Sequence, residues 1–222
     1  MKFRNKYILL FFCVLVIYSC KKDKVELTPL ASLNVTNAIV GGTTAKFGSY
    51  TPTISSNGFT QFGLKAGPID LYIWPTGDSL HPYYKQDKFS SSNGEVYSLF
   101  LAGTPAAIDA ITIKETIPYR TDSTAGIRFI NLANNNGALN ISLSTTPTIN
   151  EVTGLAYKLF TEFKSYPGLY NSAPTFQIKN AAGTVLTTFA FTATTVPRFS
   201  NVTLVIRQNG TGVGVFRVNN DR

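Results

Sequence analysis

The chain has 222 residues and a formal net charge of +8, with 14% charged and 44% hydrophobic side chains. One histidine and two cysteines leave few side chains for metal ligation or nucleophilic catalysis. The positive charge is scattered apart from a short cluster at residues 21–24, so the basic stripe typical of nucleic-acid-binding proteins is not predicted.

The first 19 residues have the layout of a bacterial signal peptide. Lys2, Arg4 and Lys6 form a positive start, and residues 7–18 form an unbroken apolar stretch. A transmembrane helix needs about 20 apolar residues, so this shorter stretch fits the hydrophobic region of a cleaved signal. We therefore predict a signal peptide at 1–19.

Cys20 follows the small residue Ser19, and the sequence Ile-Tyr-Ser-Cys resembles a bacterial lipobox. In lipoproteins the peptidase cuts before a cysteine that already carries diacylglycerol. We predict that Cys20 is lipidated, with palmitate among its chains, and that several acyl chains together anchor the protein durably. The expected location is the outer membrane, facing the periplasm or the cell surface. The alternatives are a plain secretory signal and an uncleaved N-terminal anchor.

Residues 20–30 are polar and contain a proline, which predicts a flexible tether. The other cysteine, Cys13, leaves with the signal, and Cys20 is consumed by lipid. We therefore expect a folded part without disulfides, thiolate metal sites or a cysteine nucleophile.

From residue 31 onward, apolar and polar residues alternate with a period of two, and Gly, Asn and Pro mark frequent turns. No convincing helical periodicity is present. Residues 155–163 fit either two helical turns or a strand or irregular edge, and we favour the latter. The predicted strands are 32–38, 69–74, 95–102, 110–115, 126–132, 138–143, 175–179, 184–192, 201–208 and 214–218.

Four stretches of the first half have counterparts in the second half, in the same order. Such fixed-order similarity indicates a duplicated unit. We predict an all-β protein of two tandem immunoglobulin-like or transthyretin-like β-sandwich domains, at 31–118 and 126–222, joined by a linker at 119–125. The matched pairs are 32–42 with 126–137, 59–67 with 160–168, 69–74 with 174–179, and 97–104 with 203–211.

A lipoprotein signal followed by tandem β-rich units resembles the DUF4397 family of Bacteroidetes. The supporting motifs are Ile-Arg-Phe-Ile-Asn-Leu at 127–132, Tyr-Lys-Leu-Phe at 157–160 and Tyr-Pro-Gly at 166–168. The resemblance covers most of residues 31–222, although the first unit lacks the arginine that the second has at Arg128. It implies a fold and a location, and it implies no catalytic residues.

Two groups of aromatic residues are candidates for stacking on a sugar. The first belongs to an aromatic-rich loop expected to run from Trp74 through Tyr83 and Tyr84 to Phe89, and the second contains Tyr166, Tyr170 and Phe176. The alternative interpretation places these rings in the core or in an interface.

The tripeptides at 78–80 and 122–124 resemble a short O-glycosylation motif of Bacteroidetes, with Ser79 and Ser123 as acceptors. Ordinary turns are the alternative. His81 lies near Asp78 and Ser79 in sequence, but neighbours in one turn rarely form a catalytic triad, so we expect a surface turn.

These patterns predict a non-catalytic binding or adhesion module at the cell surface, with a glycan or a protein as partner. The alternative is a structural or fimbria-like envelope subunit that pairs through exposed strands. A hydrolase has the least support. We expect no enzyme activity, no metal and no cofactor.

Overall fold

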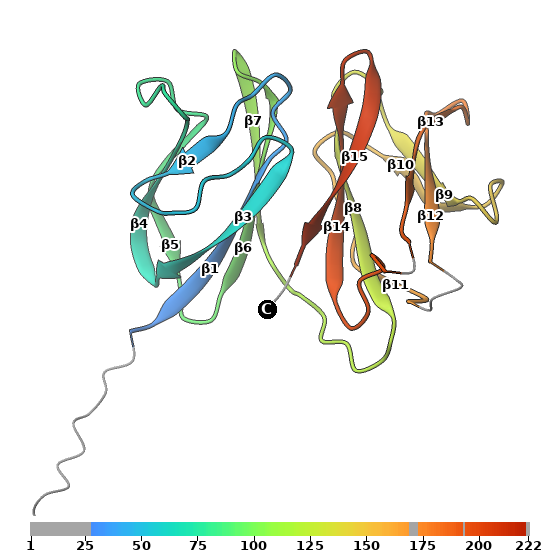
Figure 1. The fold of residues 1–222 in the computed structure, drawn as a ribbon, viewed down its shortest axis with the longest axis horizontal. Helices are drawn as coiled ribbons and strands as arrows, with labels where there is room; N and C mark the ends of the chain where they lie inside the picture. Colours follow the sequence, from blue (N-terminus) through green and yellow to red (C-terminus); the bar gives the residue numbers. More distant parts are fainter. Residues whose placement is uncertain (1–27, 169–172, 193, 221–222) are drawn as a thin grey trace, which may run out of the picture.

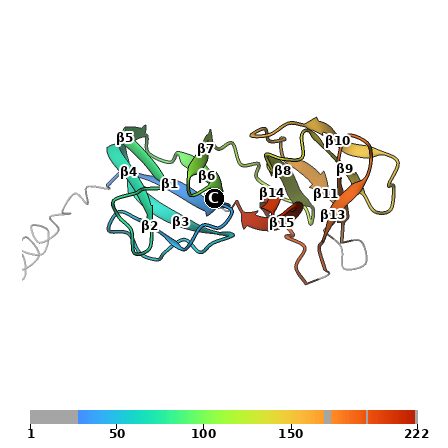
Figure 2. The same ribbon diagram turned by 90° about the horizontal axis from the view of Figure 1, so that it is seen from above.

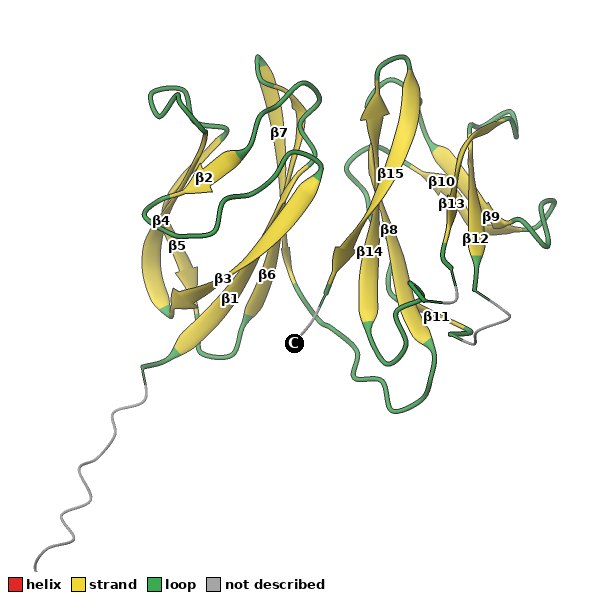
Figure 3. Ribbon diagram, in the orientation of Figure 1, coloured by secondary structure: helices red, strands yellow, loops and turns green. Residues whose placement is uncertain are grey.

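The computed structural model describes residues 28–168, 173–192 and 194–220. Its secondary structure is β throughout: 15 strands form four sheets, and the described residues contain no helix (Figures 1 and 3). The all-β sandwich expectation is confirmed. No helix among these residues is long and apolar enough to cross a membrane.

The first half folds into two facing sheets of seven strands in all. The inner sheet has the order β3-β1-β6-β7, and the outer sheet has the order β2-β4-β5. Residues 84–89, expected to belong to the aromatic-rich loop, lie in strand β5, so that expectation is wrong. The strands are β1 (Leu30–Asn37), β2 (Ala45–Phe47), β3 (Gly58–Lys65), β4 (Gly67–Pro75), β5 (Tyr84–Ser91), β6 (Val96–Thr104) and β7 (Ala107–Lys114).

The second half repeats this plan with one additional strand. Its inner sheet has the order β11-β8-β14-β15, and its outer sheet has the order β10-β9-β12-β13. Residues 156–163 run as an irregular edge beside β8, with one bridge from Phe160 to Ile130, as favoured from the sequence. The strands are β8 (Ala125–Leu132), β9 (Leu139–Leu143), β10 (Asn150–Leu155), β11 (Lys164–Tyr166), β12 (Thr175–Lys179), β13 (Val185–Ala190), β14 (Asn201–Asn209) and β15 (Gly212–Asn219).

The inner sheets of the two halves also share their register. β1 pairs in parallel with β6, and β8 pairs in parallel with β14. Leu33 lies opposite Tyr97 in the first half, and Ile127 lies opposite Val202 in the second. Tyr97 therefore corresponds to Val202, which shifts the match of 97–104 with 203–211 by one residue. Parallel neighbours need a crossover, and here the outer sheet supplies it in place of a helix.

Each half has its own apolar core between its two sheets. In β4, Leu71 and Ile73 point inward and meet Leu33 and Leu99 of the inner sheet. In the second half, Phe176 of β12 is fully buried in the corresponding cluster, together with residues of β8 and β14. The core-facing positions therefore alternate with outward ones in the outer strands, as the period of two predicts.

A third apolar cluster joins the two inner sheets. It contains Phe100 and Ile113 from the first half and Ile130 and Val205 from the second. The halves lie side by side in both views, so the sheets stack as four layers: outer, inner, inner, outer (Figures 1 and 2). The central strands are thus covered on both faces, and every residue of β8 is buried. This explains why 126–132 carries apolar residues on both of its faces, Ile127 and Phe129 towards one core and Ile130 and Leu132 towards the other.

The connection between β7 and β8 covers residues 115–124 and overlaps the linker expected at 119–125. It runs along the end of the molecule at which β1 begins (Figure 1). The division of the chain into two separable domains stays a prediction.

Candidate functional site

The outward surface of the outer sheet β2-β4-β5 carries a pair of aromatic rings. Because Leu71 and Ile73 of β4 enter the core, the alternate residues Tyr72 and Trp74 face away from it. Their ring centroids are 5.4 Å apart and the rings are inclined by 48°. Both side chains are partly exposed, so the pair offers apolar ring surface to a ligand.

Two cations flank this pair on the neighbouring strands. Lys46 of β2 lies opposite Trp74, and Lys85 of β5 lies opposite Tyr72. Both lysines are exposed, and the ammonium of Lys85 is 3.5 Å from a carboxylate oxygen of Asp87. We call Lys46, Tyr72, Trp74 and Lys85 the aromatic face. Such a surface combines stacking with hydrogen-bond donors.

The β4–β5 connection is tied to the aromatic face by one hydrogen bond. The hydroxyl of Tyr72 donates to the carbonyl oxygen of Ser79 over 2.7 Å. Within the connection, Asp78 accepts the backbone N–H groups of Leu80 and His81, and Nδ1 of His81 lies 2.8 Å from its second carboxylate oxygen. The hydrogen bond with His81 lowers the pKa of Asp78. The expected surface turn is confirmed, since the His81 side chain is 81% exposed.

The structure separates the first group of candidate aromatic residues. Trp74 lies on the aromatic face, whereas Tyr83 is buried and accepts the N–H of Thr43 at 3.0 Å. Tyr84 packs partly against the core, and its hydroxyl donates to Gln86 over 2.6 Å. Tyr72 was missed as a candidate, although the alternation of Leu71 and Ile73 with Tyr72 and Trp74 was already readable in the sequence.

The second group is not brought to the surface. Tyr166 is buried against Phe176, with ring centroids 5.1 Å apart at 89°. Its hydroxyl donates to Glu151 over 3.1 Å, and burial raises the pKa of the tyrosine. Tyr166 is therefore a core residue, and Tyr170 lies outside the described residues.

The two serines expected as glycosylation acceptors occupy the same kind of turn. The N–H of Leu80 donates to Asp78 at 3.2 Å, and the N–H of Thr124 donates to Asp122 at 3.1 Å. Each aspartate thus closes a local turn around the serine that follows it. Ser79 is exposed and Ser123 is half-buried. The lipidation candidate Cys20 lies outside the described residues.

A buried ion pair links the two halves where their inner sheets meet. The guanidinium of Arg128 binds both carboxylate oxygens of Glu115, one of them over 2.8 Å, and Nε donates to Thr203 over 2.7 Å. The two side chains are only 4% and 1% exposed. The ring of Phe163 covers the guanidinium, with its centroid 4.5 Å from Cζ. These contacts satisfy the buried charge, so the pair is a structural element rather than a reactive one.

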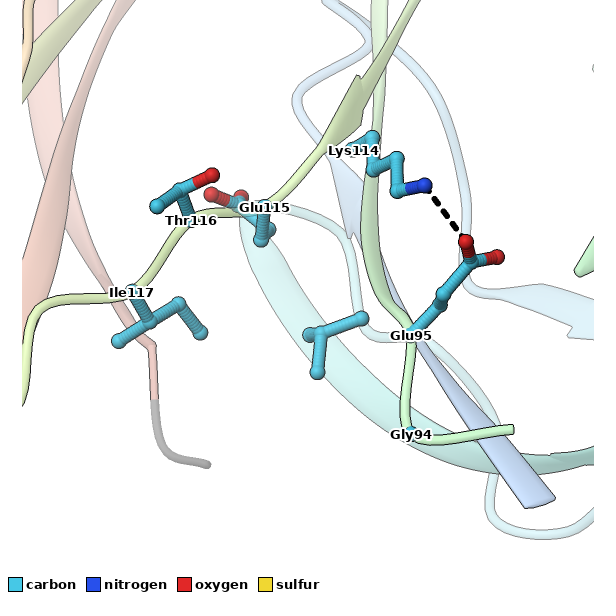
Figure 4. A pocket seen from close by; sticks show the side chains of 7 residues that line it. Gly94, Glu95, Lys114, Glu115, Thr116 and Ile117 are labelled. Atoms are coloured by element: carbon cyan, nitrogen blue, oxygen red, sulfur yellow. Dashed lines mark hydrogen bonds and ion pairs between the residues drawn. The ribbon is translucent and has the colours of Figure 1, made fainter. Parts of the chain in front are cut away.

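A pocket of about 450 Å³ lies beside this pair (Figure 4). Glu95, one of the two carboxylates that line it, accepts hydrogen bonds from Lys114 over 2.5 Å, the N–H of Ser92 over 2.7 Å and the hydroxyl of Tyr97 over 2.8 Å. The bond from Lys114, followed by the other two, lowers the pKa of Glu95 to about 2. A carboxylate held so firmly in its charged form is a poor proton donor near neutral pH.

Within the described part of the chain, no three His, Cys, Asp or Glu side chains cluster as metal ligands would. Comparison with known proteins finds no matching family model and no matching curated protein. The aromatic face therefore stands as the candidate site on its geometry alone.

Proposed function

We propose that this protein is a lipid-anchored, non-catalytic binding module of the bacterial cell surface, and that its aromatic face binds a glycan. The observation that carries the proposal is the outward pair of Tyr72 and Trp74 between Lys46 and Lys85. The resemblance to the DUF4397 family of Bacteroidetes, with its tandem immunoglobulin-like or transthyretin-like units, belongs to the same proposal.

The physical argument for a glycan starts from the position of the two rings. They contribute nothing to the core below them, which is closed by Leu71 and Ile73. Partly exposed apolar surface gathered on a rigid sheet is typical of a contact site. Sugar rings present flat patches of C–H groups that pack on aromatic faces, and their hydroxyl groups accept hydrogen bonds from lysines. The aromatic face offers both kinds of contact.

The proposed anchor is Cys20, followed by the tether at 20–30. Strand β1 begins at Leu30, where the predicted tether ends, so the anchor would lead directly into the inner sheet. The proposed location is the outer membrane, on its periplasmic or cell-surface side. Replacement of Cys20 by alanine is expected to abolish incorporation of labelled palmitate and to release the protein from membranes.

The binding proposal is tested with a glycan array followed by titration of the strongest hit. Trp74 is the only tryptophan of the chain, so its emission reports directly on the aromatic face. The informative variant is Tyr72→Gln with Trp74→Lys, because β12 carries Gln177 and Lys179 at the corresponding positions. Its binding is measured by calorimetry, and we expect it to be lost while the thermal midpoint stays close to that of the wild type.

Leu80→Ala is the matched control, because Leu80 is 84% exposed in the connection beside the aromatic face but is not part of it. It should bind as the wild type does. A wild-type protein that binds no glycan, or a double variant that binds normally, would reject the glycan proposal.

A further inference from the structure

The end of the molecule at which β1 begins carries the two most exposed tyrosine and phenylalanine residues among the described residues. Tyr119 is 77% exposed and Phe199 is 58% exposed. They come from different connections, β7–β8 and β13–β14, yet they line the same shallow pocket. The remaining exposed phenylalanine and tyrosine, Phe160 and Tyr50, reach only 40% and 38%.

This aromatic pair lies on a surface that continues to the start of β1. Leu30 is itself 55% exposed, and its carbonyl accepts the N–H of Gly94 at 2.7 Å. Gly94 lines one pocket together with Ile117, and Ile117 lines the next pocket together with Tyr119 and Phe199. Figure 1 shows the start of β1 and the connection from β7 to β8 at the same end. We call Leu30, Tyr119 and Phe199 the tether end.

Phe199 is held there at a local backbone cost. Its φ is +56°, in the left-handed region that bulky side chains rarely adopt, and its N–H donates to the carbonyl of Thr124 at 3.1 Å. An exposed phenylalanine in this conformation stabilises neither the core nor the turn. Glycine or asparagine would suit the turn better. The presence of a phenylalanine therefore indicates that its side chain contacts a partner outside the chain.

Cations accompany the exposed apolar groups. Arg198 is exposed next to Phe199, and Lys65 is exposed opposite Leu30 in the β1–β3 pair. One exposed acid, Asp122, lies in the same region and is engaged by the N–H and hydroxyl of Thr124. Aromatic rings beside arginine and lysine are typical of protein surfaces that rest in the headgroup layer of a bilayer.

We propose that the tether end lies on the bilayer, with Tyr119 and Phe199 in the headgroup layer of the leaflet that holds the lipid of Cys20. This inference rests on the proposed lipid anchor. A tether of about ten residues reaches at most about 35 Å when fully extended, so the bilayer is the surface nearest to this end. The strands then stand upright, with the aromatic face directed sideways and the β4–β5 connection at the far end (Figure 1).

The test places single tryptophans in the lipidated full-length protein, in a background in which Trp74 is replaced by phenylalanine. Phe199→Trp and Tyr119→Trp report on the tether end, and Leu80→Trp, at the opposite end, is the matched control. Each protein is reconstituted into phosphatidylcholine vesicles with or without bromine near the top of the acyl chains. We expect bromine to remove most of the emission of the two tether-end probes and to leave that of Leu80→Trp unchanged.

Flotation of the same vesicles separates the two proposals. Protein that floats with the vesicles, but whose tether-end probes are no more quenched than the Leu80→Trp probe, overturns the orientation and leaves the anchor standing. Protein that does not float overturns the anchor and the orientation with it. Tyr119→Trp keeps the test decisive if Phe199→Trp disturbs the turn, because Tyr119 is largely solvent-exposed.

Discussion

The outer sheets of the two halves share their inward residues and differ in their outward ones. Leu71 and Ile73 of β4 correspond to Phe176 and Ile178 of β12, and all four are fully buried. The outward positions hold Tyr72 and Trp74 in the first half, but Gln177 and Lys179 in the second. The shared core fixes the scaffold, so the two outer surfaces differ in their outward residues, and within the described residues only the first half carries an aromatic face.

The two outer sheets also differ in how far neighbouring connections cover their outward side chains. Lys179 is only 7% exposed, because its ammonium bonds to the carbonyl of Pro147 in the β9–β10 connection. The corresponding surface of the first half is left open at Lys46 and Lys85, both of which are exposed. The position of Lys179 is held in the first half by Trp74, whose side chain is partly exposed, and this favours the first half as the proposed binding surface.

The inner sheets differ at one central pair of positions. Asn34 and Ser98 lie side by side in the first half, where Arg128 and Thr203 lie in the second. The amide nitrogen of Asn34 donates to the carbonyl of Asn219 at 3.0 Å, but its oxygen and the Ser98 hydroxyl have no hydrogen-bond partner among the described residues. Arg128 instead donates three hydrogen bonds, one to Thr203 and two to Glu115. The second half therefore supplies the stronger polar link between the halves.

The largest expected effect comes from breaking that link. Arg128→Ala leaves the carboxylate of Glu115 buried and uncompensated, which should lower the free energy of unfolding by about 3–5 kcal/mol. Urea unfolding followed by circular dichroism measures the change. Because the halves share an apolar cluster, we expect one transition that moves as a whole.

Two variants sharpen this comparison. Asn34→Ala, at the corresponding position of the first half, should cost about 1 kcal/mol, since it removes one hydrogen bond. Arg128→Met combined with Glu115→Leu removes both charges and should recover most of the stability. An Arg128→Ala protein as stable as Asn34→Ala would show that the buried pair does not hold the halves together.

A smaller difference in stability is expected between variants of Asn37 and Asn131, the asparagines near the ends of β1 and β8. Asn131 donates to the carbonyl of Leu155 at 2.9 Å and accepts the N–H of Ala133 at 2.9 Å. Asn37 donates to the carbonyl of Thr43 at 2.9 Å, but its bond from the N–H of Ile39 is long, at 3.4 Å. Asn131 also donates to a second carbonyl at 3.3 Å.

Both asparagines are fully buried, so alanine at either position leaves backbone groups without a partner, at about 1–3 kcal/mol. We expect Asn131→Ala to be the more destabilising of the two in urea unfolding, because it breaks more and shorter bonds. Equal losses would mean that the geometry of these bonds does not matter.

The smallest expected change in stability concerns Glu95. The corresponding residue of the second half is not ionisable. The pKa of Glu95 is lowered from 4.5 to about 2 in the folded protein. The stability that it contributes is complete above its unfolded value of 4.5 and is lost as the pH falls towards 2. Glu95→Gln should therefore be less stable than the wild type at pH 7, and the difference should shrink on acidification.

Thermal unfolding between pH 7 and pH 2 measures this trend. Asp87→Asn is the matched control, because Asp87 is exposed and only loosely paired with Lys85. A difference between Glu95→Gln and the wild type that stays constant over this range would contradict the assignment.

The sequence predicted the strands whose two faces differ most. The pattern of 69–74 indicated β4, although not which of its residues face the core, and the Asn-Gly turn after 201–208 indicated the β14–β15 hairpin. Strands β2 and β11 were missed because three residues are too few to show a period. Strands β3 and β10 were missed as well, because glycine and polar residues interrupt the apolar alternation in both. Strand β5 was taken for a loop because the run Lys-Gln-Asp-Lys at 85–88 is polar on both faces.

Only part of the candidate site could be predicted from the sequence. Trp74 was identified, but Tyr83 and Tyr166 were chosen by residue type, and their burial follows from contacts with distant parts of the chain. The pairing of Arg128 with Glu115 could not be predicted, because it depends on how the two inner sheets meet. The period of the sequence shows which residues share a face of a strand. It does not show which sheet packs against that face.

The central place of β1 has a mechanical consequence. β1 lies between β3 and β6, in register with both over most of its length. Drag on a ligand held by β4 would pull Leu30 along the strand axis, whereas the hydrogen bonds to both neighbours run across it. The load then shears many bonds at once instead of peeling them apart one by one. A protein anchored as proposed would therefore resist unfolding under flow, and β1, the strand next to the proposed tether, would bear the force.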